Sequence, residues 1–410
     1  MRFGMVTTFY PPRHFGGDAL HVQSLARALV RAGHDVEVVS FPAAYRAAGG
    51  HVVGGTVARG PTLEPDGVIV HRLEHPMGVL AAVWMHQAGT AGPYRAALAA
   101  ILDRGFDVLH FHNVSLAGGP EVLGAGRARR RVLTLHDFWF VCPMHALWKN
   151  RERACDRPEC TSCCLRSHRP VQLWRLGGAR DLALAGIDVV IAPSAWSART
   201  HRDRGITVPI DVLPLFSRFT ASDCAQASLP ARARYLYAGR LTASKGVRLL
   251  LSLFARLPEY DLVVAGDGDE RAALVAEYGG LPNVQFAGQV DDAALRMLFV
   301  GATATLMASL GPESFGLVAI ESMTLGTPVL ALDAGGVSEL IRESGGGVVC
   351  ADLDALEKAI RRIAADGSLR ETLSRRGRAA GAERYSERRF LDDYLALVTP
   401  RPAVDRTAVA

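Results

Sequence analysis

Short apolar runs rich in β-branched residues alternate with helical patterns along most of this chain, and this alternation limits its fold more than any other feature. The first run covers residues 3–9, and a loop containing Gly16 and Gly17 separates it from a helix that Asp18 opens and Gly33 closes. A repeated order of strand, helix and strand is typical of βαβ units around a parallel sheet. We therefore predict an α/β fold.

The alternation occurs in two separate series, which predicts two domains. The strands predicted for the first series cover residues 3–9, 36–40, 107–111, 132–135 and 189–192, and those for the second cover residues 235–238, 262–265, 284–287, 302–307, 328–332 and 347–349. A length of 410 residues also exceeds that of a typical single domain. We expect two doubly wound, Rossmann-like domains that face each other across a cleft, with ligands at the carboxyl ends of their strands.

The periodicity weakens after residue 213, which sets the expected boundary between the domains. The predicted organisation is an N-terminal domain over residues 1–213, a linker over 214–232, a C-terminal domain over 233–385, a helix over 386–400 that returns to the N-terminal domain, and a flexible tail over 401–410.

The composition excludes several classes of protein. Hydrophobic residues make up 49% and charged residues 21% of the chain, which is ordinary for a globular protein. The net charge of +5 is too dilute for a nucleic-acid footprint, so no nucleic-acid partner is expected. No apolar run reaches the roughly 20 residues of a spanning helix, and no secretory signal pattern opens the sequence. The expected location is the cytoplasm.

Two cations follow the first strand of the predicted C-terminal domain. This strand ends in Gly239-Arg240-Leu241, and Lys245-Gly246 comes next, before a helix. A guanidinium, an ammonium and the free N–H groups of a helix start suit a diphosphate, although such a pair can also be solvated surface. The following strand ends in Gly266-Asp267-Gly268, where glycines either allow the close approach of a ligand or form an ordinary turn.

A pair of carboxylates provides the strongest signal. Glu313 and Glu321 stand eight positions apart, the first before a helix expected to begin near Phe315 and the second inside it. Glu321 would lie near the apolar face of that helix, where an ionised carboxylate needs strong hydrogen bonds. Ribose hydroxyls would supply them, and the alternative is an ion pair with a neighbouring Arg or Lys.

The sequence P-E-S-F-G-L-V-A-I-E-S-M-T-L-G-T-P-V, preceded by G-R-L-x3-K-G, resembles the retaining nucleotide-sugar glycosyltransferases of the GT-B fold, family 4. The motif M-V-T-T-F-Y-P-P with Gly16-Gly17 and the L-H-D motif at residues 135–137 are similar to the same family, so the resemblance spans nearly the whole chain. It implies a nucleoside-diphosphate sugar held mainly by the C-terminal domain and an acceptor held mainly by the N-terminal domain. It also implies transfer with retention at the anomeric carbon and no required metal cofactor.

The resemblance assigns a role to each matching residue. Arg240 and Lys245 would neutralise the diphosphate, and Glu321 would bind the ribose hydroxyls. Glu313 would hold the donor sugar, and His136 would contact the sugar during transfer, so these two and the two cations are the predicted catalytic residues. The residues predicted to bind the donor are Gly16, Gly17, Gly239, Arg240, Lys245, Gly266, Gly268, Gln289, Val290, Glu313, Ser314, Phe315, Gly316, Leu317 and Glu321.

Three further expectations concern the cleft. The base should stack against the loop at Gly288-Gln289-Val290, and His112 is a candidate on the acceptor side, with a structural histidine as the alternative. After the last strand of the first domain, family members often show Asn-Gly-Val-Asp, whereas this chain reads Val-Leu-Pro-Leu-Phe at residues 212–216. Acceptor and hinge contacts at that point therefore cannot be transferred from the family.

A block of cysteines follows the L-H-D motif, within a predicted insertion near residues 142–168. Its members are Cys142, Cys155, Cys160, Cys163 and Cys164. In a reducing compartment such a cluster suggests a structural zinc or another metal, with Cys142, Cys155, Cys160 and Cys163 as ligands. A disulfide and unpaired thiols are the alternatives, and no catalytic role is expected.

Aromatic and basic residues flank this block and leave two interpretations open. Trp139, Trp148, Trp174, Arg166 and Arg169 could shape the acceptor side or contact a membrane surface, or the tryptophans could simply pack the insertion, which we favour. The basic run at residues 127–131 is expected to be a solvated loop, with an acidic lipid or a phosphate as the alternative ligand.

These observations predict a retaining glycosyltransferase that moves a sugar from a nucleoside diphosphate to a hydroxyl of a glycan, a lipid-linked sugar or a small molecule. A nucleotide-sugar epimerase or a phosphorylase-like enzyme of the same fold is the first alternative. A non-catalytic subunit that binds nucleotide sugars is the second. A dehydrogenase is disfavoured because no G-x-G-x-x-G follows the first strand. Contact with the inner face of a membrane is compatible with this prediction.

Overall fold

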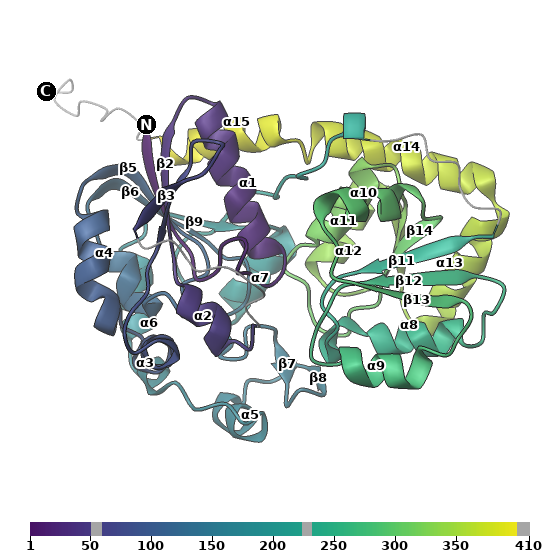
Figure 1. The fold of residues 1–410 in the computed structure, drawn as a ribbon, viewed down its shortest axis with the longest axis horizontal. Coiled ribbons are helices and arrows are strands. Elements are labelled where there is room, and N and C mark those ends of the chain that lie inside the picture. Colours follow the sequence, from purple (N-terminus) through teal and green to yellow (C-terminus); the bar gives the residue numbers. More distant parts are fainter. Residues whose placement is uncertain (51–59, 224–231, 400–410) are drawn as a thin grey trace, which may run out of the picture.

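The computed structural model describes residues 1–50, 60–223 and 232–399, so the predicted tail and part of the predicted linker lie outside the described residues. The N-terminal half folds around a sheet with the strand order β10-β9-β6-β5-β1-β2-β4-β3, which is parallel except at the β3–β4 pair (Figure 1). The central strand β1 pairs with β2 through Met5 and Val38, and with β5 through Met5 and His110. Nearly all of β1 is buried, which explains its continuous apolar sequence.

The C-terminal half contains a parallel six-stranded sheet in the order β13-β12-β11-β14-β15-β16. The strands of the first sheet are β1 (Arg2–Val6), β2 (Asp35–Ser40), β3 (Pro61–Leu63), β4 (Ile69–Arg72), β5 (Phe106–Phe111), β6 (Ala128–Thr134), β9 (Val189–Ala192) and β10 (Asp211–Val212). Those of the second are β11 (Arg234–Ala238), β12 (Asp261–Ala265), β13 (Val284–Gly288), β14 (Ala304–Met307), β15 (Val329–Leu332) and β16 (Gly347–Cys350). The predicted α/β class with two Rossmann-like units is confirmed.

Helices flank both sheets (Figure 1). The helices of the N-terminal half are α1 (Gly17–Arg31), α2 (Pro42–Ala47), α3 (Val79–Ala88), η1 (Gly92–Tyr94), α4 (Arg95–Leu102), η2 (Gly119–Gly124), α5 (Cys160–Arg166), η3 (Leu173–Leu176), α6 (Ala179–Ala185) and α7 (Ala195–Asp203). The later ones are η4 (Ala221–Asp223), η5 (Ala243–Lys245), α8 (Val247–Phe254), α9 (Arg271–Tyr278), α10 (Asp292–Val300), α11 (Leu317–Thr324), α12 (Gly336–Ser344), α13 (Leu353–Ala365), α14 (Gly367–Glu383) and α15 (Glu387–Val398). None of the described helices is long and apolar enough to cross a bilayer.

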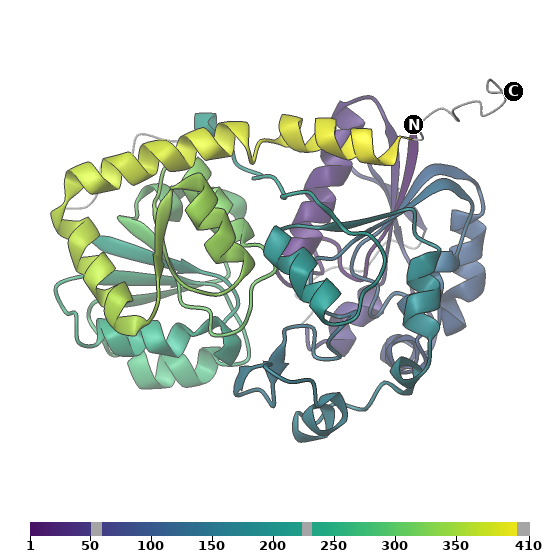
Figure 2. The ribbon, with the colours of Figure 1, turned by 180° about the vertical axis from the view of Figure 1, so that it is seen from behind.

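The last two helices run along one side of both domains (Figure 2). Helix α14 packs on α11 of the C-terminal domain, whereas α15 lies against the N-terminal domain. There the Tyr394 hydroxyl hydrogen-bonds to His110 Nδ1 at 2.9 Å, and Arg31 pairs with Glu387 at 2.6 Å. The ring of Phe390 stacks on that of Tyr394 within the same buried cluster as Phe3. The end of the described chain thus returns to the domain in which the chain begins.

One buried apolar cluster extends through both domains. It includes Val22 and Leu25 of α1, Ile320 and Met323 of α11, and Phe390 of α15. Because burial of apolar surface is the main favourable term in folding and association, this shared cluster stabilises the arrangement of the two domains. The carboxyl ends of the two sheets meet beside it.

The basic run at residues 127–131 was predicted to be a loop, and this prediction is wrong. Most of it belongs to β6, which pairs with β5 and β9. The guanidinium of Arg131 donates to the carbonyls of Leu123, Ala125 and Gly126 at 2.6–2.9 Å, and Arg130 lies 3.7 Å from Asp188. These partners allow charged residues at the start of an internal strand.

Two smaller differences also have local causes. Helix α11 begins at Leu317 rather than near Phe315, because Gly316 has a φ of 128° and cannot belong to the helix. Residues 142–168, which we call the cysteine segment, contain a two-stranded hairpin of β7 (Trp148–Lys149) and β8 (Arg153–Ala154). These strands are too short to leave a pattern in the sequence.

Candidate active site

Two loops at the carboxyl ends of β11 and β14 bring a cation and a carboxylate together. Lys245, at the end of η5 and next to α8, places its Nζ atom 2.5 Å from Glu313 Oε1. The hydroxyl of Ser309 donates to the same carboxylate oxygen at 2.5 Å. The side chain of Glu313 is only 14% exposed, and groups from two other points of the chain, Lys245 and Ser309, hold its carboxylate in position.

The electrostatic environment keeps Glu313 ionised. Burial alone would raise the pKa of Glu313, but the charge and hydrogen bond of Lys245, the hydroxyl of Ser309 and the charge of Arg240 outweigh burial, and the pKa is lowered. Arg240 is exposed, and no carboxylate within the described ranges lies at ion-pair distance from it. The site therefore carries one cation paired with Glu313 and a second cation open to a ligand.

Asp18, at the start of α1, is a half-buried carboxylate that sequence reasoning did not assign to the site. Burial raises its pKa to about 6, against the opposing effects of the Ala19 backbone and of Arg240. The amide of Asn113 lies 3.5 Å from one of its oxygens. Asp18 comes from the N-terminal domain and Arg240 from the C-terminal domain, so the two domains supply charges to one site.

Glu321 is buried, and its partner is the linker residue Arg218 rather than a neighbouring basic residue. Arg218 Nε donates to Glu321 Oε1 at 2.6 Å, and Arg218 also pairs with Asp292. Burial raises the pKa of Glu321 and is only partly offset by Arg218. Of the two interpretations of Glu321, the ion pair is therefore present in the structure, and the contact with ribose hydroxyls stays a prediction.

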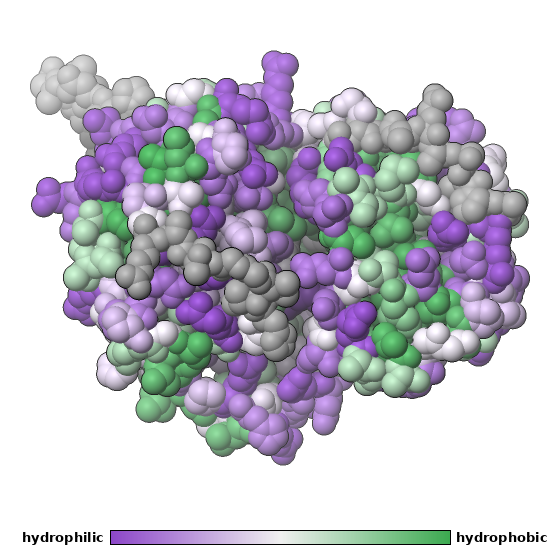
Figure 3. Space-filling view, viewed as in Figure 1, coloured by the Kyte–Doolittle hydropathy of each residue, from purple (hydrophilic) through white to green (hydrophobic). Residues whose placement is uncertain are grey.

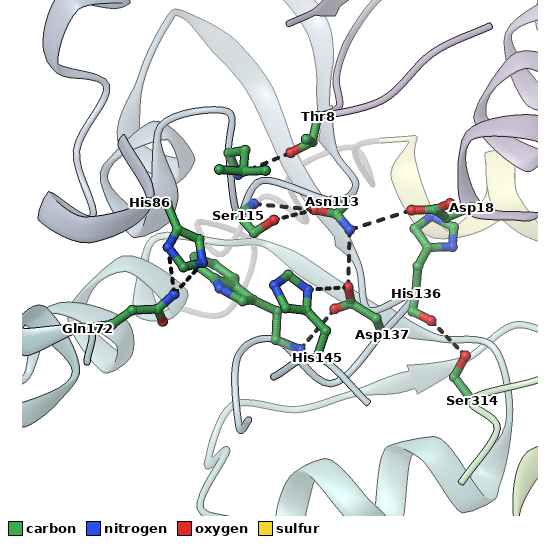
Figure 4. Close-up of polar contacts among 12 residues, drawn as sticks. Thr8, Asp18, His86, Asn113, Ser115, His136, Asp137, His145, Gln172 and Ser314 are labelled. Atoms are coloured by element: carbon green, nitrogen blue, oxygen red, sulfur yellow. Dashed lines mark hydrogen bonds and ion pairs between the residues drawn. The ribbon is translucent and has the colours of Figure 1, made fainter. Parts of the chain in front are cut away.

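Ser314 and Leu317 contact the N-terminal domain directly. The Ser314 hydroxyl donates to the carbonyl of His136 at 2.6 Å (Figure 4). Ser194 donates to the carbonyl of Ser314 at 2.7 Å. A Cβ atom at Gly17 would lie 2.6 Å from a methyl group of Leu317. The missing side chain of Gly17 thus makes room for Leu317, and the donor contact expected at Gly17 stays a prediction.

The glycines after β11 and β12 also serve close packing. Gly239 and Gly266 have positive φ angles, and a Cβ atom at Gly266 would lie 1.9 Å from the carbonyl oxygen of Gly239. A Cβ atom at Gly268 would lie 2.3 Å from the carbonyl oxygen of Leu241. These residues therefore hold the Arg240 loop against its neighbour. At Gly16, by contrast, φ is 77° and a Cβ atom would meet nothing within 4 Å, so space beside it is open.

The buried His112 and the half-buried His136 form a pair just after β5 and β6. His112 Nδ1 lies 3.0 Å from His136 Nε2, and both line a small cavity with Asn113 and Asp137. Burial lowers the pKa of His136 to about 4 and holds the pKa of His112 well below its usual value, so both rings are neutral near pH 7. His112 thus fixes the ring of His136.

Asp137 connects this pair to the cysteine segment. It accepts hydrogen bonds from His145 Nδ1 at 2.9 Å, from the Trp139 backbone N–H at 2.9 Å and from Asn113 at 3.1 Å (Figure 4). Burial would raise the pKa of Asp137, but these partners, with His145 first, lower it. The L-H-D motif pointed to this residue, whereas its partners are visible only in the structure.

The predicted base-stacking loop follows β13, where Gln289 is exposed and Val290 is half-buried beside the start of α10. Phe315 is buried in the cluster shared by the two domains. Some of the predicted donor residues, such as Lys245 and Glu313, therefore lie in loops at the carboxyl ends of the strands. Others, such as Phe315, pack beneath these loops.

The structures most like this one include sucrose-phosphate synthase from Thermosynechococcus elongatus, with a TM-score of 0.71 and 21% identity over 97% of this chain and 98% of that one. HepE from Anabaena, in complex with UDP and glucose, gives a TM-score of 0.68 and 19% identity over 98% of this chain and 100% of that one. These likenesses show the fold, which is that of the GT-B glycosyltransferases.

Residues 15–216 match the model of Glycosyltransferase Family 4, and residues 226–380 match that of Glycosyl transferases group 1. The two matches adjoin and cover most of the sequence, and the chain belongs to the family 4 glycosyltransferases. A lipopolysaccharide core biosynthesis glycosyltransferase of Rhizobium meliloti is 31% identical over 52% of this chain. That match covers 65% of the relative, which is just under two thirds of its length.

Lys245→Met should reverse the pH dependence that Glu313 gives to stability. In the wild-type chain the lowered pKa of Glu313 means that the carboxylate stabilises the fold above the unfolded-state pKa of about 4.3, and this contribution is lost as the pH falls through the folded pKa. Without Lys245, burial would raise the pKa, so the contribution would be lost as the pH rises through that raised value. Unfolding temperatures measured between mildly acidic and neutral pH would report the difference.

Arg248→Met is the matched control for this experiment. Arg248 lies on α8 of the same domain and pairs with Glu277 at the surface. Its loss should leave the shape of the profile unchanged. A Lys245→Met profile parallel to that of the wild type would contradict the description of the Glu313 environment.

Proposed function

We propose that this glycosyltransferase takes a sugar from a nucleoside-diphosphate donor and transfers it, with retention, to a hydroxyl of a glycan, a lipid-linked sugar or a small molecule. The observation that carries the proposal is the group formed by Arg240, Lys245 and Glu313 at the carboxyl ends of β11 and β14, facing His136 of the other domain. Two cations beside a helix start suit a diphosphate, and a buried carboxylate suits sugar hydroxyls.

The proposed chemistry depends on positioning and charge. The bond between the anomeric carbon and the diphosphate oxygen breaks, and Arg240 and Lys245 stabilise the negative charge that develops on the leaving group. The acceptor oxygen forms its bond to the same carbon from the same face, and the acceptor proton passes to the departing diphosphate. Two protein cations can balance this charge, so the proposal requires no metal cofactor.

The remaining groups orient the donor. Glu313 is ionised and would accept hydrogen bonds from the donor sugar. His136 is neutral, because its pKa is lowered to about 4, and would contact the sugar through hydrogen bonds rather than as a cation. Glu321 would bind the ribose at the oxygen that Arg218 leaves free. His112 is a positioning residue, since it reaches the sugar only through His136.

Two comparisons support the donor class and one suggests an acceptor class. HepE binds UDP and glucose in its solved complex, and the family models describe glycosyltransferases, so neither an epimerase nor a non-catalytic subunit is favoured. The Rhizobium relative acts in lipopolysaccharide core biosynthesis, which is consistent with a lipid-linked sugar as acceptor.

Arg240→Ala and Lys245→Ala should each weaken binding of the donor nucleotide by about 10- to 100-fold, because a hydrogen bond to a charged group contributes about 1.5–3 kcal/mol. A thermal-shift screen of UDP, GDP, ADP and dTDP would first identify the base, and calorimetry with that nucleotide would then measure the variants. Arg248→Ala, which removes a surface cation of α8, should bind like the wild type. Unchanged binding in both site variants would refute the donor site.

The stereochemistry of the product tests the retaining mechanism separately from binding. An α-linked donor sugar should give an α-linked product, which the anomeric proton coupling in an NMR spectrum reports directly. A β-linked product would exclude the same-face mechanism even if the donor site proved correct.

An exposed apolar surface on the N-terminal domain supports contact with a membrane. We refer to it as the α3 surface, since Figure 3 shows apolar residues gathered over this helix at the lower left. On α3, Leu80 is 67% and Trp84 is 55% exposed, and η3 packs beside the helix with Leu176 77% exposed. The exposed Arg166 ends α5, and the exposed Arg169 lies between α5 and η3 in the sequence. Exposed apolar residues with cations suit an anionic bilayer surface.

Leu80→Asp and Trp84→Asp should each reduce sedimentation with vesicles that contain phosphatidylglycerol by about tenfold, because a charge replaces an inserted apolar group. Met297→Asp is the control, since Met297 is 56% exposed on the C-terminal domain. Equal vesicle binding by all three variants would contradict a specific role of the α3 surface. So would wild-type protein that binds neutral vesicles as well as it binds vesicles containing phosphatidylglycerol.

A further inference from the structure

Four cysteines that are separate in the sequence line one small cavity beside the β7–β8 hairpin. Cys142 lies in the turn after β6, Cys155 follows β8, and Cys160 and Cys163 belong to the first turns of α5. Cys142 and Cys163 are buried, Cys155 is half-buried and Cys160 is exposed. Cys164 is buried but does not line the cavity. None of the cysteines that the structure describes takes part in a disulfide.

Backbone groups point at two of these sulfur atoms. The N–H of Asn150 donates to Cys163 Sγ at 3.2 Å, and the backbone of Met144 and of Leu147 hydrogen-bonds to the thiol of Cys142. Hydrogen bonds to the donor atoms of a metal site orient those atoms. The backbone of this segment therefore holds the sulfur atoms of Cys142 and Cys163 beside the cavity.

The same segment contains strained backbone. Within the described ranges, every non-glycine residue with a positive φ lies here, and these residues are His145, Leu147, Asn150, Arg151 and His168. The local apolar cluster is small, with Phe138, Cys142 and Leu147 as its buried members. Left-handed backbone at such residues persists only where other interactions stabilise it. The apolar contacts of the segment provide little of that stabilisation.

Two cations lie beside the cavity. The side chain of Lys149 lines it, is only 4% exposed and pairs with Glu159 at 3.1 Å. Arg204 donates to the Cys155 carbonyl at 2.6 Å and lies 3.9 Å from its sulfur atom. A divalent metal with four thiolates carries a net charge of −2, which the Arg204 guanidinium would balance in part.

We propose that Cys142, Cys155, Cys160 and Cys163 bind one structural Zn²⁺ ion with tetrahedral geometry. No three His, Cys, Asp or Glu side chains among the residues described here already surround one point at metal-binding distance, so the thiols would turn into the cavity that they line. Four Zn–S bonds form, each thiol gives up its proton to solvent, and no group is oxidised or reduced. The ion then joins three segments of the chain and stabilises the strained turns between them.

The position of the hairpin gives this ion a role in the cleft. A Cβ atom at Gly311 would lie 3.3 Å from the ring of Trp148, and Arg151 pairs with Asp269 at 3.0 Å. Both contacts cross from the cysteine segment to the C-terminal domain, and Gly311 lies two residues before Glu313. Figure 1 shows the hairpin beside the C-terminal domain, so a metal bound there would stabilise a segment that contacts the Glu313 loop.

The metal content of the full-length protein, purified under reducing conditions without added metal, tests the proposal. We expect about one zinc per chain, and Co²⁺ in its place should give the visible absorption of a tetrahedral tetrathiolate complex. Cys163→Ser should lower zinc content at least tenfold. Cys164→Ser, which changes a buried neighbour outside the cavity, should keep the metal. Chelation of the wild-type protein should lower the unfolding temperature.

Three results would overturn the proposal. The first is wild-type protein without bound metal that also gives no tetrathiolate spectrum when titrated with Co²⁺, a measurement that does not depend on whether the variants fold. The second is equal loss of metal in Cys163→Ser and Cys164→Ser. The third is a disulfide among these cysteines in mass spectra of alkylated, unreduced protein. None of these measurements depends on donor binding at Arg240, so the proposed function is tested independently.

Discussion

Ser314 hydrogen-bonds to the N-terminal domain through both of its polar oxygen atoms, and the geometry of the candidate active site depends on these two bonds. Its hydroxyl donates to the carbonyl of His136, and its own carbonyl accepts from Ser194. Gly336 makes this approach possible, because a Cβ atom there would lie 2.3 Å from the Ser314 oxygen. Since Glu313 directly precedes Ser314, the same contacts hold the carboxylate of one domain opposite the histidine of the other.

A second polar contact completes this side of the interface. The carboxylate of Glu339, on α12, accepts hydrogen bonds from the backbone N–H groups of Ala195 at 2.7 Å and Trp196 at 2.8 Å. These groups lie at the start of α7, where helix N–H donors lack partners within the helix and the helix dipole favours negative charge. Away from the site, the apolar cluster through α15 stabilises the same arrangement. Polar contacts therefore set the positions of the site residues, while apolar burial supplies most of the attraction between the domains.

The sequence was sufficient to predict the buried strands, because strands covered on both faces consist of continuous apolar runs. It was misleading at β6, whose first residues are arginines that the fold satisfies through distant carbonyls and carboxylates. The residue types of the site were predictable as well, but not their partners. Lys245 and Glu313 are 68 positions apart, and Arg218 and Glu321 are 103 apart, so only the folded chain shows these pairs. Asp18 was missed because a carboxylate at a helix start is ordinary capping chemistry.

The two carboxylates of one motif illustrate how the fold separates chemical roles. Burial raises the pKa of both Glu313 and Glu321, and the net direction differs only because their partners differ. Glu313 has Lys245 for its own partner, a hydroxyl donor and the nearby charge of Arg240, whereas Glu321 shares Arg218 with Asp292. Lys245 alone neutralises Glu313, and Arg240 makes no ion pair among the residues that the structure describes. An anionic ligand could therefore pair with Arg240, which gives the site a physical reason to bind phosphate beside a carboxylate.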